Sequence, residues 1–181
     1  MGHDDISILP AEPSDLEPVV ELTLLVFFGD LGRDFGFNNN RATAFYELGI
    51  EQRQSVRGCL EDSSAVSLKA TRRDELVGFV TGSREGVLTN LAVHPTARRA
   101  GLGRRLVQQL CEEASVPITL EVDSDNLPAL ALYQACGFAV TQEQPGTRYI
   151  VDWWRGRCVE RVTKVAMMRQ RHAGAGESEG G

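Results

Sequence analysis

The sequence lacks the signatures of several protein classes. Its four cysteines form no Cys-x-x-Cys pair and no metal-ligand spacing, so neither a metal site nor a dithiol redox centre is expected. No apolar run approaches the roughly 20 residues of a membrane-spanning helix, and the N-terminus has neither the basic nor the apolar region of a secretory signal. Unpaired cysteines are typical of a reducing compartment.

Positive charge is scarce as well. The 25 Asp and Glu residues outnumber the 19 Lys and Arg residues, which gives a formal net charge of −6. This balance argues against nonspecific nucleic-acid binding and is compatible with a basic or amine-bearing partner. The 181 residues suffice for one substantial core. We predict one domain over residues 1–169, followed by a disordered tail over 170–181 that is rich in Gly, Ala, Ser and Glu.

Hydrophobic periodicity predicts an α/β chain. Gly49 and Gly58 are expected to interrupt or weaken the second helix. A long connection is expected before the last strand, with Tyr149, Trp153 and Trp154 as its hydrophobic anchor. The expected strands are residues 6–9, 65–71, 76–83, 87–93, 118–123, 138–142 and 161–168, and the expected helices are 16–28, 41–60, 103–114 and 127–136.

The most informative feature that is present is a glycine-rich turn at 98–103, between a predicted strand and an amphipathic helix. Glycine at a helix N-terminus lets backbone N–H groups approach a phosphate, and the helix dipole favours an anion there. A dinucleotide fingerprint would need a third glycine in place of Leu106, and the Gly-Lys-Ser/Thr of a P-loop is absent. Either another kind of anion site or a plain turn with solvated Arg98 and Arg99 fits these residues.

A second motif gives this turn a specific meaning. Val93 and Arg98-x-x-Gly101-x-Gly103 are followed by Glu121-x-x-x-x-Asn126-x-x-Ala129-x-x-x-Tyr133 and by Gly137-Phe138. In this order and spacing, the residues resemble the GCN5-related N-acetyltransferase (GNAT) family. The resemblance implies a mixed central sheet of about six to seven strands with helices on both faces. It also implies a splayed central pair of parallel strands that holds acetyl-CoA, and it implies no metal.

The same resemblance assigns roles by position. Leu91, Ala92 and Val93 would bind the pantetheine arm through the strand backbone. Asn126 would contact the pantetheine side, and Tyr133 would face the sulfur. The pyrophosphate would be held by the turn, which consists of Arg98, Arg99, Ala100, Gly101, Leu102, Gly103 and Arg104.

Two catalytic residues are predicted. Tyr133 is a candidate general acid, because a phenol is protonated at neutral pH and can donate to a departing thiolate. Glu121 is a candidate base, because the spacing from Glu121 to Tyr133 is similar to that of bacterial enzymes that acetylate the N-terminus of a ribosomal protein. Asp123 and Asp125 remain alternatives for the base.

The expected activity is acetyl transfer to a primary amine, in a protein or peptide N-terminus or a lysine. Alternatives are a small-amine acetyltransferase and a non-catalytic acyl-CoA-binding module. Residues 29–40 either border the acceptor site or form a plain solvent loop, and the acceptor is expected to be determined by this segment and by residues 146–157. We expect no nucleic-acid or membrane partner, and a monomer or homodimer. A looser similarity to plastid and cyanobacterial relatives leaves two compartments: the cytoplasm, or the plastid stroma if a transit peptide has been removed.

Overall fold

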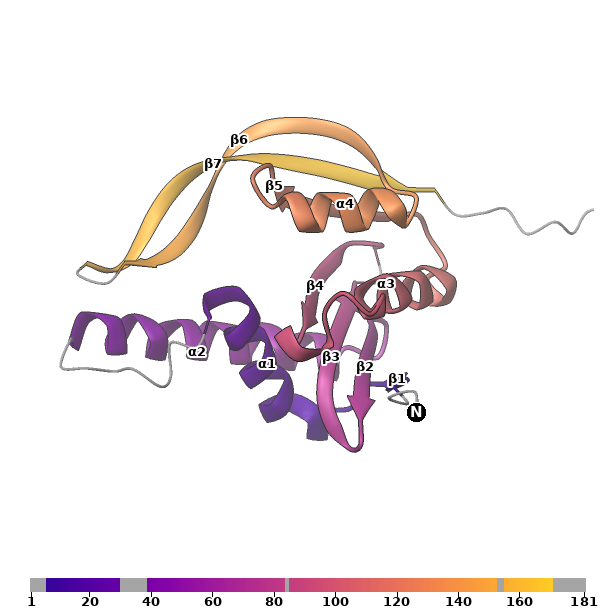
Figure 1. The fold of residues 1–181 in the computed structure, drawn as a ribbon, viewed down its shortest axis with the longest axis horizontal. Coiled ribbons are helices and arrows are strands. Elements are labelled where there is room, and N and C mark those ends of the chain that lie inside the picture. Colours follow the sequence, from indigo (N-terminus) through magenta and orange to yellow (C-terminus); the bar gives the residue numbers. More distant parts are fainter. Residues whose placement is uncertain (1–5, 30–38, 84, 153–154, 171–181) are drawn as a thin grey trace, which may run out of the picture.

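A computed structural model describes residues 6–29, 39–83, 85–152 and 155–170. Trp153, Trp154 and residues 171–181 of the expected tail lie outside these ranges. The chain order (Figure 1) is β1 (Ile6–Pro10), α1 (Leu16–Phe28), α2 (Asn39–Glu61), β2 (Val66–Arg72), β3 (Glu75–Gly82), β4 (Leu88–Val93), α3 (Leu102–Glu113), β5 (Ile118–Asp123), α4 (Leu127–Ala135), β6 (Ala139–Asp152) and β7 (Gly156–Arg169).

The strands form two antiparallel sheets that meet at one point. One sheet has the order β1-β2-β3-β4 and the other has the order β5-β7-β6. Val87 and Thr119 form an isolated parallel bridge between them, and the Thr119 N–H donates to the carbonyl of Gly86 at 2.7 Å. Beyond this bridge, the described residues show no further pairing between β4 and β5. The expected splayed pair of parallel strands is therefore confirmed.

A β-bulge in β4 accompanies the divergence of the two strands. Asn90 pairs with Thr81 and Leu88 pairs with Gly82, so Thr89 is an extra residue in the ladder. Its hydroxyl donates to the Thr81 carbonyl at 3.3 Å. A bulge bends its strand and increases the local twist, and this one lies just after the bridge at which the pairing between the two sheets ends.

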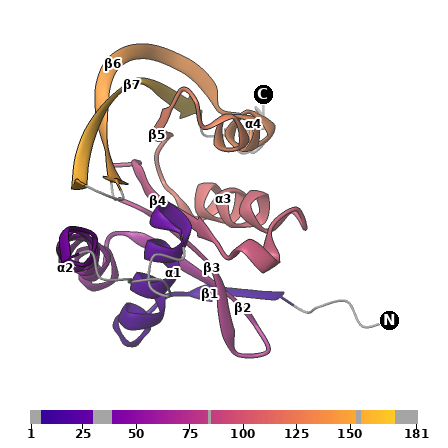
Figure 2. The same ribbon diagram turned by 60° about the vertical axis from the view of Figure 1, so that its left-hand side comes forward.

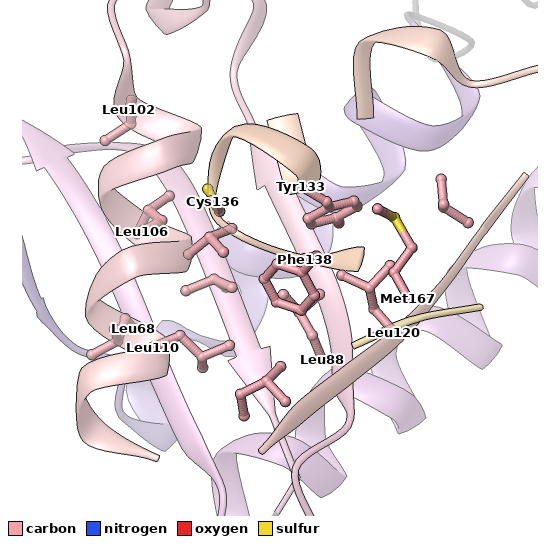
Figure 3. Close-up of a cluster of buried hydrophobic side chains, with 14 of the residues drawn as sticks. Leu68, Leu88, Leu102, Leu106, Leu110, Leu120, Tyr133, Cys136, Phe138 and Met167 are labelled. Carbon is pink, nitrogen blue, oxygen red and sulfur yellow. The ribbon is translucent and has the colours of Figure 1, made fainter. Parts of the chain in front are cut away.

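Helices cover both faces of the first sheet (Figure 2). On one face, Leu102, Leu106 and Leu110 recur at four-residue spacing along α3 and pack into a cluster with strand residues (Figure 3). A Cβ atom on Gly78 of β3 would lie only 2.9 Å from Leu106 Cδ1, so this glycine allows α3 to approach closely. On the other face, α1 and α2 pack against Phe79 and neighbouring residues.

The structure corrects two expectations. Helix α2 runs without interruption through Gly49 and Gly58, because a glycine costs only about 1 kcal/mol in a helix and buried Leu48, Val56 and Leu60 hold the helix in the second core. The other helices begin and end within two residues of the predicted positions.

The expected long connection before the last strand is wrong. Strands β6 and β7 pair continuously from Ala139↔Met168 to Asp152↔Gly156 and form one long hairpin. Tyr149 is therefore a strand residue, and its ring lies under the Arg157 guanidinium at 3.9 Å. The hairpin extends past α4 towards α2 (Figure 1), where Arg157 and Glu51 form an ion pair at 2.5 Å.

Candidate active site

The glycine-rich turn lies directly before α3, as the sequence predicts. Gly101 is the N-cap of the helix and has a φ of 78°, which favours glycine, and Arg99 has a φ of 62°. No atom lies within 4 Å of the position that a Cβ of Gly101 would take. The backbone of the turn is therefore open to a ligand, and the first N–H groups of α3 have no carbonyl one turn before them.

Gly103 has a different surrounding. A Cβ on this residue would lie 3.3 Å from Leu132 Cδ2 and 3.7 Å from Val93 Cγ2. Its lack of a side chain thus lets α3, α4 and the end of β4 pack together. The two positions therefore need glycine for different reasons: Gly101 for its positive φ and Gly103 for close packing. Of the two, only Gly101 faces open space.

The arginines of the turn are exposed, and one of them already has a partner. Arg98 Nε donates to the carbonyl of Val93 at 3.0 Å, which ties the turn to the carboxyl end of β4. Arg99 and Arg104 are exposed beside it. Along β4, Ala92 is buried, while Leu91 and Val93 are half-buried. Three exposed guanidinium groups and the helix N-terminus give the turn before α3 a local positive charge.

Asn126 and Tyr133 belong to the same helix. Asn126 is the N-cap of α4, and its side-chain oxygen accepts from the Ala129 N–H at 3.3 Å. Tyr133 lies two turns later and is only 7% exposed, with its ring centroid 5.7 Å from that of Phe138 (Figure 3). Burial, with a smaller contribution from Cys136, raises the pKa of Tyr133 to about 12, so its phenol is protonated at neutral pH.

Glu121 is exposed on β5, between buried Leu120 and Val122. The alternation predicted for this strand is confirmed. The side-chain amide of Gln144 on β6 donates to Glu121 Oε2 at 3.3 Å. The carboxylate is therefore accessible to water, and this 3.3 Å hydrogen bond from Gln144 is a long one.

The two alternative bases are ion-paired. Asp123 Oδ1 lies 2.6 Å from Lys164 Nζ, and Asp123 Oδ2 lies 3.5 Å from Arg148 Nη1. Both carboxylate oxygens of Asp125 lie 2.8 Å from the same Arg148 nitrogen. Cations therefore occupy the carboxylate oxygens of Asp123 and Asp125, whereas the Glu121 carboxylate has no ion pair among the described residues.

A groove with a volume of about 510 Å³ opens beside these residues. It runs between the end of α1, the end of β5 and the distal part of β6, and six of its nine lining residues are apolar. Asn126 lies on its wall, whereas Glu121 and Tyr133 are not among its lining residues. The lining residues are Val26, Phe27, Phe28, Asp123, Asn126, Arg148, Tyr149, Ile150 and Val151.

The sequence located this groove only in part. Arg148 to Val151 fall within the segment 146–157 that was expected to border the acceptor, but Val26 and Asp123 were not expected there. Most of the other expected segment, residues 30–38, lies outside the described residues. The position of Arg148 on the groove wall could not be predicted from the sequence, because it depends on β6 continuing as a strand to Asp152.

Three other observations concern chemistry outside the cleft. His94 Nδ1 lies 2.8 Å from the hydroxyl of Thr96 and caps a short 3-10 turn, which gives His94 a structural role. Among the described residues, no group of three or more His, Cys, Asp or Glu side chains could hold a metal ion. None of the helices in the described ranges is long and apolar enough to span a membrane.

A sequence model of the acetyltransferase (GNAT) family matches residues 35–138. The chain belongs to this family. The match covers the turn, the splayed strands β4 and β5, and α4.

Curated relatives match a shorter part of the chain. The ribosomal protein bS18-alanine N-acetyltransferase of Salmonella typhimurium is 38% identical over 80 residues, which cover 40% of this chain and 54% of that protein. The L-amino acid N-acyltransferase MnaT of Escherichia coli is 35% identical over 74 residues, covering 38% of this chain and 43% of that protein. The chain thus spans about half the length of the curated relatives it matches.

Solved structures match over nearly the whole chain. The ribosomal-protein-S18-alanine N-acetyltransferase of E. coli has a TM-score of 0.66 at 21% identity, over 98% of this chain and all of that one. The structure of YncA from S. typhimurium with acetyl-CoA has a TM-score of 0.61 at 19% identity, over 97% of this chain and 99% of that one. At these identities, the likeness establishes the GNAT fold.

Proposed function

We propose that this protein is an acetyl-CoA-dependent N-acetyltransferase whose acceptor is a primary amine of a protein or peptide. The observation that carries the proposal is the open turn at Gly101, at the head of a helix beside a splayed pair of strands. Family membership supports it. A related enzyme of the same fold was solved with acetyl-CoA.

The donor would lie along the splayed edge of β4. The backbone of Leu91 and the N–H of Val93 face that edge and have no strand partner from β5, so they can pair with the amides of pantetheine. Ala92 would lie between them, and the Val93 carbonyl accepts from Arg98. The pyrophosphate would lie at residues 98–104, where the turn offers amide donors and three exposed arginines. Asn126 would approach the pantetheine from the other side of the cleft, at the N-terminus of α4.

Two residues would move the protons. The acceptor amine must lose a proton before it can attack the thioester, and Glu121 can take it directly or through water because its carboxylate is exposed. Tyr133 would protonate the departing thiolate. Its raised pKa keeps the phenol neutral until the thiolate forms, so the donor proton is present at every physiological pH.

The acceptor would enter through this groove, whose lining combines apolar side chains with Asp123, Asn126 and Arg148. Phe27 is 47% exposed and Tyr149 is 55% exposed, and solvent-exposed aromatic side chains at a groove are typical of contact surfaces for a peptide. The named activity of the S. typhimurium relative, on the alanine of a ribosomal protein, supports a protein acceptor.

The test is an acceptor screen. The protein is incubated with acetyl-CoA and a panel of peptides with free N-termini, lysine peptides with blocked N-termini, and free amino acids, while free thiol release is followed. We expect release above background with a free-N-terminal peptide, and mass spectrometry should locate one acetyl group on its α-amine. If CoA binds but no acceptor raises thiol release, the proposed activity is wrong.

A second candidate function is acetylation of a free amino acid. The 35% identity to an L-amino acid N-acyltransferase over 74 residues favours it. The same screen separates the two functions, because an amino-acid enzyme would act on the free amino acids and would gain nothing from residues that follow the first one in a peptide.

A further inference from the structure

Five charged side chains meet where the groove adjoins the start of α4. They are Asp123, Asp125, Arg148, Glu160 and Lys164, and we term them the charged hub. Arg148 is its centre. Its Nε and Nη2 lie 2.8 Å from Glu160 Oε2, and its Nη1 lies 2.8 Å from Asp125. Lys164 completes the hub through its 2.6 Å contact with Asp123.

The β6–β7 hairpin sets the orientation of the Arg148 guanidinium. Arg148 and Glu160 are directly opposite each other in the β6–β7 ladder, and the two contacts with one carboxylate fix the plane of the guanidinium. The other side of the group then points to Asp123 and Asp125, at the carboxyl end of β5. The hydrogen bonds with Glu160 and Asp125 also raise the pKa of Arg148 above its ordinary value, so the group is always charged.

The loop that Arg148 contacts leads directly into α4. Asp125 immediately precedes Asn126, whose side chain caps the helix that carries Tyr133. Backbone bonds also shape this loop: the N–H of Ser124 donates to Thr163 at 2.9 Å, and the N–H of Leu127 donates to Asp125 at 3.0 Å. A side chain that holds Asp125 therefore also holds the start of α4.

We propose that Arg148 is a positioning residue that links the acceptor groove to the acetyl-CoA site by fixing the loop from Asp123 to Asn126. One face of Arg148 lines the groove, and the other is bound to the loop that begins α4. The inference rests on the proposed function, because it assigns the transfer reaction to the cleft between these elements.

A direct role in acceptor binding is the competing explanation for a charged residue in the groove. The contacts disfavour it, since all three guanidinium nitrogens already lie near carboxylates. An acidic acceptor would have to displace Asp125 or Glu160. It would also meet the hub's own charge, because three carboxylates outnumber two cations.

The test is a double-mutant cycle with Arg148→Gln, Asp125→Asn and the combined variant. Each single variant should lower kcat about tenfold, because a small misplacement of catalytic groups costs one to two orders of magnitude. The combined variant should be no slower than either single variant, since both break the same contact. KM for acetyl-CoA should change less than kcat. Arg161→Gln, an exposed arginine on the same hairpin with the same charge change, should transfer at the wild-type rate.

Three results would overturn the proposal. Multiplied losses in the combined variant would mean that the residues act separately. A loss in Arg148→Gln confined to acceptor KM, with Asp125→Asn neutral, would assign Arg148 to acceptor binding. A loss in Asp125→Asn alone, with a changed pH profile, would instead assign Asp125 as the base.

Amide hydrogen exchange tests the same link without any transfer reaction. Exchange in residues 123–129 should be faster in Arg148→Gln than in the wild type, and unchanged in Arg161→Gln. An unchanged rate in Arg148→Gln would refute the positioning role. If the wild type transfers acetyl to no amine, the proposed function fails, while the exchange result still decides whether Arg148 holds this loop.

Discussion

The two walls of the cleft are held in place by different forces. On the β4 side, α3 packs Leu102, Leu106, Val107 and Leu110 against the sheet, and each of these is at most 1% exposed. On the other side, most residues of the β6–β7 hairpin are exposed or half-buried. One end of this hairpin is fixed by the ladder between β7 and β5 and by buried Val165 and Met167. Farther along, its contacts include the ion pairs of the charged hub and the pair between Arg157 and Glu51.

This difference predicts that the wall formed by β4 and α3 is rigid and that the wall formed by the hairpin can move. The free energy gained by burying apolar surface is proportional to the buried area and does not depend on charges that salt can screen. The wall that would hold a constant donor is therefore fixed. Ion pairs between partly exposed groups contribute little and are screened by salt. The wall that would receive a variable acceptor is therefore the one that can shift at small cost.

The largest expected effect is on the packed wall. Leu106→Ala removes a side chain with 0% exposure and should lower the free energy of unfolding by about 3 kcal/mol. That corresponds to a fall in melting temperature of roughly 6–12 °C for a chain of this size. Val159→Ala on the hairpin, where the side chain is 61% exposed, should change stability by less than about 0.5 kcal/mol. Similar losses in both variants, measured by thermal unfolding, would contradict the comparison.

The next effect concerns Tyr133, which is buried on α4 in the same core cluster as Leu106. Its native pKa of about 12 lies above the value of about 10 that it has in an unfolded chain. The difference gives stability that is fully present below pH 10 and is lost as the pH rises towards 12. The loss amounts to about 2 to 3 kcal/mol, and Tyr133→Phe should not show it.

Absorbance titration of tyrosinate measures this directly. Of the three tyrosines, one should ionise only near pH 12 in the native protein, and Tyr133→Phe should lack that late step. In denaturant, the wild type should show no late step at all. Native curves that are the same apart from total amplitude would mean that Tyr133 is not shielded from water.

The sequence predicted the packed wall well because its signals are local. The four-residue spacing of Leu106, Leu110 and Ala114, which predicted the helix, depends on one segment of the chain, and so does the glycine-rich turn before it. The alternation of apolar and polar residues from Ile118 to Asp123 also predicted a strand without any knowledge of the distant strand with which it pairs. Such features are set by neighbours along the chain, and the structure has them at the expected positions.

The extent of the hairpin wall could not be predicted in the same way, although the antiparallel pairing of the strands expected at 138–142 and 161–168 is confirmed. Its strands are exposed on both faces over much of their length, so the alternation that marks a half-buried strand is missing. Gly146 illustrates the problem: it suggests a loop, yet a Cβ there would lie 2.5 Å from Lys164 Cγ. This glycine makes room within a strand for the lysine that binds Asp123.

A smaller effect is expected at the open turn. Gly101→Val should weaken acetyl-CoA binding by about tenfold, because a branched side chain would enter the space before α3 and a φ of 78° is unfavourable for it. Gly29→Val is the matched control, since Gly29 has a φ of 76° and also has no atom within 4 Å of its Cβ position. Its ψ of −173° lies in a region that is almost restricted to glycine, so Gly29→Val should carry at least as much backbone strain as Gly101→Val. It should still bind acetyl-CoA normally. Equal affinity of Gly101→Val and wild type in calorimetry would refute the phosphate role of the turn.

The smallest effect is expected at the tip of the hairpin. Glu51→Gln removes the ion pair with Arg157, in which Glu51 is 54% exposed. It should lower the free energy of unfolding by less than about 1 kcal/mol at low salt. In about 1 M NaCl, where screening acts over about 3 Å, the variant and the wild type should unfold at the same denaturant concentration. Leu106→Ala should keep its full deficit at both salt concentrations. If Glu51→Gln instead remains destabilised in high salt, the hairpin is held by packing as well, and the two walls differ less than their exposures indicate.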